Sequence, residues 1–265
     1  MSDELGFAEE CVREAGRRIL RHFRSDLEVR HKGPNNPVTA ADLEADGFLR
    51  EAFGRQFPSD GWLSEETADS PDRLARSRVW VVDPIDGTKE FVAGIPEFAV
   101  SLALVADHRP VIAVVFNPAA DVMVTASLGE GARRNGVTVR MTGPRQLHGS
   151  RLLVSRTEHS RGSYDHPEAG PKITPIGSIA WKLALVASGM ADATASVRPK
   201  REWDICAGGL LVEEAGGVIS DAMGGPISYN RELRLIDGIV AADARLHPIL
   251  LRWVERLPHR RPSNP

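Results

Sequence analysis

Apolar residues recur at helical spacing in two stretches near the beginning of the chain. One stretch runs from Leu5 to Phe23 and the other from Thr39 to Phe57. This spacing predicts two amphipathic helices, with Thr39 as the cap of the second. Short runs rich in β-branched residues come next, separated by "DHRP", "NPAA" and "GEGARRNG", and predict an antiparallel meander. The runs begin at Val79, Phe98, Pro110 and Asp121.

The rest of the chain alternates between strand and helix patterns. Alternation of this kind is typical of an α/β layer, which here is distinct from the first sheet. We therefore expect an α+β half over residues 1–145 and an α/β half over residues 146–265. The polar stretch Arg156–Pro171 has no periodicity and is predicted to be a mobile surface loop. Strands are expected at Arg151, Lys172, Ala191, Val218 and Ile236, and helices from Ser178, Trp203 and His247.

Composition and charge narrow the class of partner. The 265 residues are 42% apolar and 26% charged, with a formal net charge of -3. This balance shows no basic patch that would bind a nucleic-acid polymer or a membrane surface, so we expect small-molecule partners. No apolar run approaches about 18 residues and no secretory signal is present, which favours a cytoplasmic protein. Cys11 and Cys206 are expected to be reduced packing residues.

The stretch "VWVVDPIDGTKEF" places two carboxylates close together after a strand-forming run. Asp83 is expected to end the strand, because Pro84 lacks the N–H that the ladder needs. Gly87 permits a tight bend, and "TKEFV" can begin a short helix. Two carboxylates so close favour a bridging divalent cation. The alternative is that Asp83 is a turn residue and Asp86 a helix cap.

Two further acidic stretches bear on these alternatives. "GWLSEET" carries Glu65 and Glu66 after a short apolar run, and "REWDICAGG" places Asp204 at the start of a helix. Each can be explained without a metal, the glutamates as solvated loop charges and Asp204 as an N-cap. Together, however, these stretches supply the four or five carboxylates that a site for two cations needs.

"SEE", "DPIDGTKEF" and "WDICAGG", in this order and spacing, resemble the inositol monophosphatase superfamily of magnesium-dependent phosphatases. The similarity extends from "PVTAADLEAD" near Pro37 to "VEEAGGVISD" ending at Asp221. It implies a layered α-β-α-β-α sandwich with mixed sheets, two or three Mg²⁺ ions per active site and, often, a homodimer.

The resemblance also implies the metal ligands. Glu65, Asp83 and the backbone carbonyl of Ile85 would hold one Mg²⁺. Asp83, Asp86 and Asp204 would hold the second, so that Asp83 bridges the two ions. Most of these ligands lie in the first half of the chain, and Asp204 lies in the second.

The resemblance also implies roles for three further residues. Gly87 and Thr88 would present backbone N–H groups to the substrate phosphate, and Asp42 would pair with the Thr88 hydroxyl to orient the attacking water. Hydrolysis of phosphate monoesters is among the slowest uncatalysed reactions, and two cations are suited to accelerating it. No cysteine or histidine stands out as a covalent nucleophile, so direct attack by water is our hypothesis. The predicted catalytic residues are Asp42, Glu65 and Thr88.

The substrate is harder to infer. Lys89 in "DGTKEF" and the stretch "PIGSIAWKLALVASG" resemble the bacterial 3'(2'),5'-bisphosphate nucleotidases. At Ser196, inositol phosphatases carry a glutamate and bacterial nucleotidases tend to carry an arginine, and both are absent. Arg198 and Lys200 could bind a second phosphate instead. The predicted substrate contacts are Asp86, Gly87, Thr88, Lys89, Ser178, Arg198, Lys200 and Asp204.

Adenosine 3',5'-bisphosphate is accordingly the first substrate prediction, with AMP and phosphate as the products. Inositol 1-phosphate, or another sugar phosphate or bisphosphate, is the alternative. A non-catalytic module that binds metal or nucleotide is a third reading, although Asp42, Glu65, Asp83, Asp86 and Asp204 are all in place.

Overall fold

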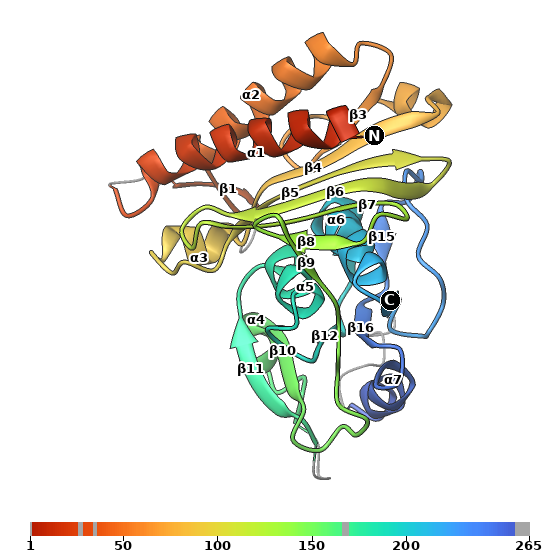
Figure 1. Cartoon of the computed structure of the whole chain (residues 1–265). Coiled ribbons are helices and arrows are strands. Elements are labelled where there is room, and N and C mark those ends of the chain that lie inside the picture. Colours follow the sequence, from red (N-terminus) through yellow and green to blue (C-terminus); the bar gives the residue numbers. More distant parts are fainter. Residues whose placement is uncertain (1, 26–28, 34–35, 166–169, 258–265) are drawn as a thin grey trace.

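Helices and sheets alternate in layers through the molecule. The computed structural model describes residues 2–25, 29–33, 36–165 and 170–257. In Figure 1 the layers follow one another as helices, sheet, helices, sheet and helix. The first layer holds α1 (Ser2–His22) and α2 (Ala40–Gln56), and the last holds α7 (His247–Glu255). The predicted α-β-α-β-α sandwich with mixed sheets is therefore confirmed.

The larger sheet has seven strands in the order β3-β4-β5-β6-β7-β8-β9. β3 runs parallel to β4, and every other neighbouring pair is antiparallel. The predicted meander is present, and β8 and β9 extend it by two short strands. The strands are β3 (Gly61–Ser64), β4 (Arg78–Asp86), β5 (Ala99–Ala106), β6 (Arg109–Asn117), β7 (Val122–Ser127), β8 (Ala132–Arg134) and β9 (Val137–Val139).

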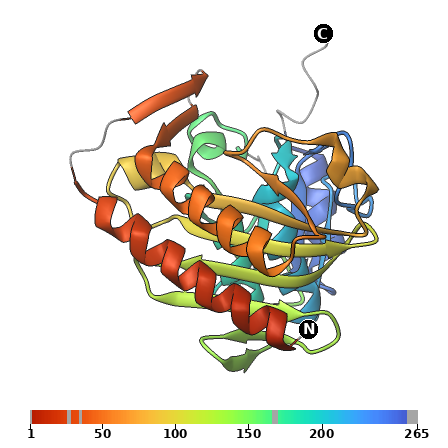
Figure 2. The same ribbon diagram turned by 90° about the horizontal axis from the view of Figure 1, so that it is seen from above.

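The direction of the apolar side chains along its strands explains why both faces of this sheet are buried. In β5, Val100, Leu102 and Leu104 pack into the core beneath α1 and α2, whereas Ala103 and Val105 pack into the core on the opposite face. Successive strand residues point to opposite faces, so an unbroken apolar run predicts burial on both sides. Figure 2 shows α1 and α2 lying across one face of this sheet.

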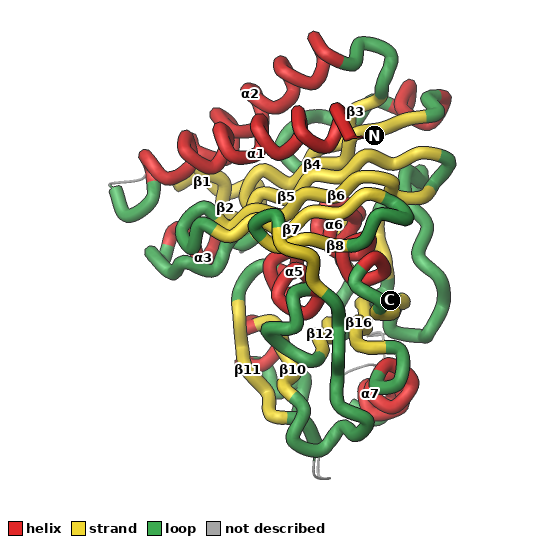
Figure 3. The backbone as a smooth tube through the Cα atoms, viewed as in Figure 1, coloured by secondary structure: helices red, strands yellow, loops and turns green. Residues whose placement is uncertain are grey.

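The smaller sheet has five strands in the order β11-β10-β12-β16-β14. Figure 3 shows α5 (Ile179–Ala187) and α6 (Glu202–Glu214) between the two sheets, with α7 on the outer face of the smaller one. The division at residue 145 stays a prediction. The strands are β10 (Arg151–Ser155), β11 (Lys172–Ile176), β12 (Ala193–Ser196), β14 (Gly217–Ser220) and β16 (Ile239–Asp243).

Short elements complete the described chain. β1 (Val29–Gly33) pairs with β2 (Asn36–Thr39), and β13 (Lys200–Arg201) pairs with β15 (Leu235–Ile236). The 3₁₀ helix η1 (Pro71–Ala75) follows β3, and α3 (Thr88–Val92) follows β4, as the sequence predicted for α3.

The polar stretch Arg156–Pro171 differs from its prediction. Its first residues form the short helix α4 (Arg156–Ser160), and the side chains of Glu158 and Tyr164 are each only 2% exposed. The loop prediction is therefore wrong for Arg156–Ser160, which form a helix, and Tyr164 is buried although residues 161–165 belong to no helix or strand. Residues 166–169 of the stretch lie outside the described residues. A helix of five residues is too short to show a hydrophobic period, and its buried side chains carry polar groups that satisfy one another.

Candidate active site

β4 continues past the point where the sequence predicted its end. Asp83 pairs with Ser101 of β5 and Asp86 pairs with Ala99, with a shift of register between them. Pro84 lies within this irregularity, where its missing N–H interrupts no regular ladder, so the expected strand end at Asp83 is a β-bulge instead. The Asp83 carboxylate is held there by the Ile85 N–H, which donates to Oδ1 at 3.0 Å.

Strand register brings Glu65 beside Asp83. Val79 and Val81 face the core that contains α6, so Asp83, two residues further along β4, faces it too. The parallel neighbour β3 pairs Leu63 with Val81. Glu65 therefore comes level with Asp83, and its N–H donates to the Val82 carbonyl at 3.2 Å.

Asp204 reaches the same place from α6. The Ser101 hydroxyl of β5 donates to the Trp203 carbonyl at 3.1 Å, which fixes the start of α6 against the larger sheet. The Asp204 carboxylate also accepts the Arg201 N–H at 2.9 Å, as an acidic residue in a capping box does. Ligand oxygens of Glu65, Asp83 and Asp204 all lie within 4.8 Å of one another.

The three carboxyl groups lie close enough to repel one another when they are ionised. Burial, followed by repulsion from Glu65, Asp86 and Asp204, raises the pKa of Asp83 well above its usual range. Burial, with Asp86 and Glu65 nearby, raises the pKa of Asp204 to about 8. An all-oxygen set of this kind fits a hard divalent cation such as Mg²⁺, which would replace the missing positive charge.

Asp86 lies in the same cleft but outside this group. Its Oδ2 accepts the Ser178 hydroxyl and the Ala180 N–H, both at 2.6 Å, at the start of α5. Ser178 has a φ of 52°, an uncommon backbone conformation for a serine. The structure thus ties Asp86 to α5 through Ser178, and the role of Asp86 as a metal ligand stays a prediction.

Lys182 of α5 holds the turn that contacts Asp86. Its ammonium donates to the carbonyls of Ile176, Gly177 and Ser178 at 3.1, 3.3 and 2.9 Å. The residue is only 2% exposed, and burial lowers the pKa of its ammonium to about 8. The sequence contained Lys182 but gave no sign that the ammonium is buried.

Gly87 begins α3 in a conformation that suits glycine. Its φ is 99°, and a Cβ at this position would lie 2.8 Å from the Glu97 carbonyl oxygen. The next residue, Thr88, donates its hydroxyl to the Ile85 carbonyl at 3.0 Å and to Asp42 Oδ1 at 3.4 Å. The structure therefore brings Asp42 and Thr88 together, while their role in orienting water stays a prediction.

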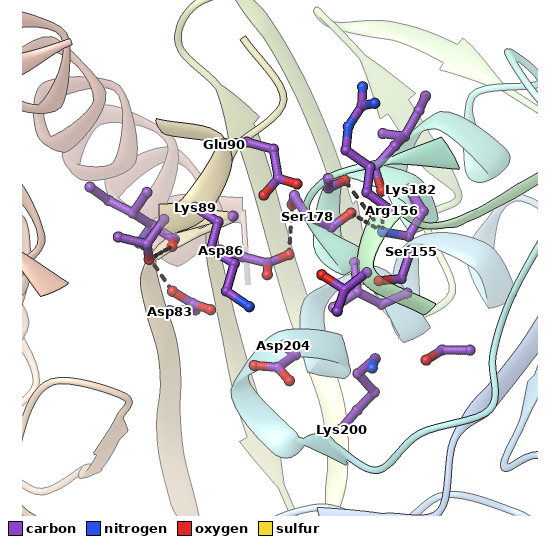
Figure 4. A pocket seen from close by; sticks show the side chains of 18 of the residues that line it. Asp83, Asp86, Lys89, Glu90, Ser155, Arg156, Ser178, Lys182, Lys200 and Asp204 are labelled. Atoms are coloured by element: carbon purple, nitrogen blue, oxygen red, sulfur yellow. Dashed lines mark hydrogen bonds between the residues drawn. The ribbon is translucent and has the colours of Figure 1, made fainter. Parts of the chain in front are cut away.

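A cleft of about 270 Å³ opens over these groups. In Figure 4, Asp83, Asp86 and Asp204 lie to the left of Lys182 and Arg156. Among the residues predicted to contact substrate, Arg198 does not line the cleft, because the chain bends at this residue and leaves it exposed. Those that do line it are Asp86, Gly87, Thr88, Lys89, Ser178, Lys200 and Asp204.

Comparison with known proteins identifies the family of this chain. Residues 1–259 match the model of the inositol monophosphatase family. The chain is 38% identical to the inositol-1-monophosphatase of Rhizobium meliloti strain 1021 over 229 residues, 82% of this chain and 84% of that protein. It is 32% identical to the Nus factor SuhB of Escherichia coli K12 over 263 residues, 95% of each chain.

A solved structure shows the same arrangement. The Thermotoga maritima IMPase superposes with a TM-score of 0.85 at 28% identity, covering 96% of this chain and 97% of that one. The fold and the family match define a phosphomonoesterase, in a class whose members are generally metal-dependent. The chain belongs to the inositol monophosphatase family.

In the part of the chain that the structure describes, no helix has the length and apolar character needed to cross a bilayer. The resemblance to the bisphosphate nucleotidase branch and the homodimer both stay predictions.

Proposed function

We propose that this protein is a Mg²⁺-dependent phosphatase that hydrolyses the phosphate monoester of a polyol, such as inositol 1-phosphate. The main support for a metal-dependent reaction is that carboxylate oxygens of Glu65, Asp83 and Asp204 lie within 4.8 Å of one another in the cleft. Like charges at this distance are unfavourable without a cation, so the group is suited to binding one.

The residues around the carboxylates fit the parts of the reaction. When bound, divalent cations stabilise charge on a phosphoryl group in transfer and activate water. Gly87 and Thr88 offer backbone N–H groups to the phosphate at the turn into α3. Asp42 and the Thr88 hydroxyl orient the attacking water, and Glu65 lies close enough to the other carboxylates to share in this task.

The charges on the other side of the cleft favour a leaving group without a second phosphate. Arg156 makes a bidentate pair with Glu97, with contacts of 2.6 to 3.0 Å. The Lys182 ammonium donates hydrogen bonds to three carbonyls, and the Lys200 ammonium forms an ion pair with Glu158 at 3.1 Å. Because each of these cations already makes an ion pair or hydrogen bonds within the described chain, it offers a dianionic phosphate little additional attraction.

Hydroxyl groups suit the same part of the cleft. The lining there includes the partly exposed hydroxyls of Ser155 and Thr157 and the same cations, a polar surface that can exchange hydrogen bonds with a polyol. The name of the Rhizobium relative, inositol-1-monophosphatase, agrees with this substrate class.

Adenosine 3',5'-bisphosphate is the second candidate, and Lys89 is the observation that favours it. Lys89 lines the cleft from α3, and its side chain is exposed rather than held in a buried pair. A flexible ammonium at the rim can reach the second phosphate of a nucleotide.

A comparison of substrates separates the two candidates. Phosphate release would be measured with Mg²⁺ on inositol 1-phosphate, adenosine 3',5'-bisphosphate and fructose 1,6-bisphosphate, and kcat/KM compared. We expect inositol 1-phosphate to be preferred by about 100-fold, which corresponds to about 2.7 kcal/mol in transition-state binding. A similar preference for the nucleotide, lost in Lys89→Met, would overturn the polyol assignment and establish the second candidate.

A further inference from the structure

One buried carboxylate, next to residues that line the cleft but not itself part of the lining, has no part in the site described so far. Glu158 of α4 is only 2% exposed, and its carboxylate accepts hydrogen bonds from four groups. They are the Ser196 hydroxyl, the Tyr164 hydroxyl at 2.5 Å, the Val197 N–H at 3.0 Å and the Lys200 ammonium at 3.1 Å. A buried charge with this many partners holds each of them in a fixed place.

The hydrogen bonds keep Glu158 ionised. Burial alone would raise the pKa of its carboxyl, but the Lys200 ammonium and the donors Ser196, Tyr164 and Val197 N–H outweigh burial and lower it. With four donors around its two oxygens, the carboxylate has little capacity left for a ligand. Glu158 therefore orients neighbouring groups rather than meeting the substrate itself.

Ser196 and Lys200 are the members of this network that line the cleft, and of these two Lys200 has the accessible side chain, since Ser196 is fully buried. The Lys200 side chain is 16% exposed, lines the cleft, and belongs to β13, just before the helix that carries Asp204. Figure 4 shows Lys200 beside Asp204, with Asp83 further to the left. Within the described chain, Glu158 is the one acceptor bonded to the ammonium, which has three N–H groups.

The reaction geometry indicates what Lys200 meets. If the phosphate lies over the carboxylates and the turn at Gly87, the leaving group of an in-line displacement extends away from them, into the part of the cleft lined by Ser196 and Lys200. The bond to Glu158 orients the Lys200 ammonium and leaves it N–H groups that can donate to a hydroxyl oxygen of the leaving group.

We propose that Lys200 donates a hydrogen bond to a hydroxyl oxygen of the polyol leaving group and that Glu158 is the positioning residue that aims it. This inference rests on the proposed function and specifies how the substrate's alcohol is recognised. Lys200 is then a specificity residue for the leaving group, separate from the groups that bind the phosphate.

The test separates the leaving group from the phosphate. Lys200→Met and Glu158→Gln would be assayed with Mg²⁺ for hydrolysis of inositol 1-phosphate and for competitive inhibition by inorganic phosphate, which has no leaving group. We expect Lys200→Met to lose about 10- to 100-fold in kcat/KM, mainly through KM, because a hydrogen bond from a charged donor is lost. The inhibition constant for phosphate should change less than about threefold.

Glu158→Gln should change the same constants in the same direction, and Lys200→Arg should restore part of the loss. Lys172→Met, which removes an exposed lysine outside the cleft, is the matched control and should match the unsubstituted protein. If Glu158→Gln does not fold, Lys200→Met decides alone, because its side chain is the more exposed.

Two results would overturn the inference while leaving the proposed function intact. One is an active protein in which Lys200→Met behaves as the control does, and the other is an equal loss in KM and in phosphate inhibition. If the unsubstituted protein released no phosphate from inositol 1-phosphate, the proposed function would fail and the inference would fail with it.

Discussion

Proton release on metal binding is the prediction that follows most directly from the three carboxylates. Without a cation, burial, Asp86 and Glu65 raise the pKa of Asp204 to about 8. Only the ionised carboxylate can bind Mg²⁺, so protons compete with the metal. A group with this pKa is ionised in about 1% of molecules at pH 6 and about 10% at pH 7, so the apparent affinity falls to about 1% and about 10% of its value for the ionised protein.

The expected dependence is therefore about tenfold in Mg²⁺ affinity per pH unit between pH 6 and pH 7.5, becoming flat above about pH 8.5. The raised pKa values of Asp83 and Asp86 act in the same direction and can make the dependence steeper. Isothermal titration calorimetry in two buffers with different ionisation enthalpies measures both the dissociation constant and the number of protons released. We expect about one proton or more per site at pH 7.

Two variants make this experiment specific. Asp204→Asn removes one of the titrating groups and should make the pH dependence shallower, while Asp121→Asn, which changes an exposed carboxylate that pairs with Arg13, should leave it unchanged. A dissociation constant that stays within about twofold from pH 6 to pH 9 would refute the reasoning, because the carboxylates would then not be protonated in the metal-free protein.

Three further predictions concern stability. The pKa values of Asp83, Asp86 and Asp204 are raised in the metal-free native state. Between about pH 4 and pH 8 the native state therefore binds more protons than the unfolded state, so the free energy of unfolding should fall as the pH rises through this window. Thermal melting with EDTA at several pH values would measure it, and a rise would contradict it. Lys182→Met leaves buried carbonyls without a donor and should lower the free energy of unfolding by about 3 kcal/mol in urea titrations, where a change below about 1 kcal/mol would count against the assigned bonds. Gly87→Ala should lower the free energy of unfolding by about 2 kcal/mol more than Gly129→Ala does. Both glycines have positive φ, but a Cβ would meet a backbone oxygen at 2.8 Å at Gly87 and no atom within 4 Å at Gly129. Equal losses of stability in the two variants would exclude that clash.

Local patterns in the sequence were enough to predict most of the helices and strands, whereas the layered sandwich was predicted from the family resemblance. The apolar alternation of β5 and the helical spacing of α1 and α2 depend on neighbours within one element, so a single sequence displays them. The same holds for the turn at Gly87 and the acidic end of β4, because the strand run, proline and glycine are adjacent in the chain.

Contacts between distant segments could not be read in this way. The parallel pairing of β3 with β4 sets Glu65 level with Asp83, and it depends on register rather than on local composition. Lys182 resembles a solvated helix lysine in sequence, and its burial becomes visible only once α5 lies between two sheets. Arg198 was placed beside the cleft by its spacing alone, which a bend in the chain makes irrelevant.

Glu158 was missed although the sequence contained a signal for it. Ser155 and Glu158 have the spacing of a helix N-terminus, and the Ser155 hydroxyl does accept the Glu158 N–H, at 3.4 Å. This pattern would have predicted α4 within the supposed loop. The partners of Glu158 at Ser196 and Lys200 are about 40 residues away, so its burial could not have been predicted from the same pattern.

The most direct test of the central claim is Mg²⁺-dependent phosphate release from inositol 1-phosphate by the unsubstituted protein and by Asp83→Asn, with Asp121→Asn as the control. The account predicts release that EDTA abolishes and Mg²⁺ restores, and a loss of about 1000-fold or more in Asp83→Asn, since several kcal/mol of charge stabilisation depend on the metal. Release that is indifferent to EDTA, or that survives in Asp83→Asn at the level of the control, would contradict it.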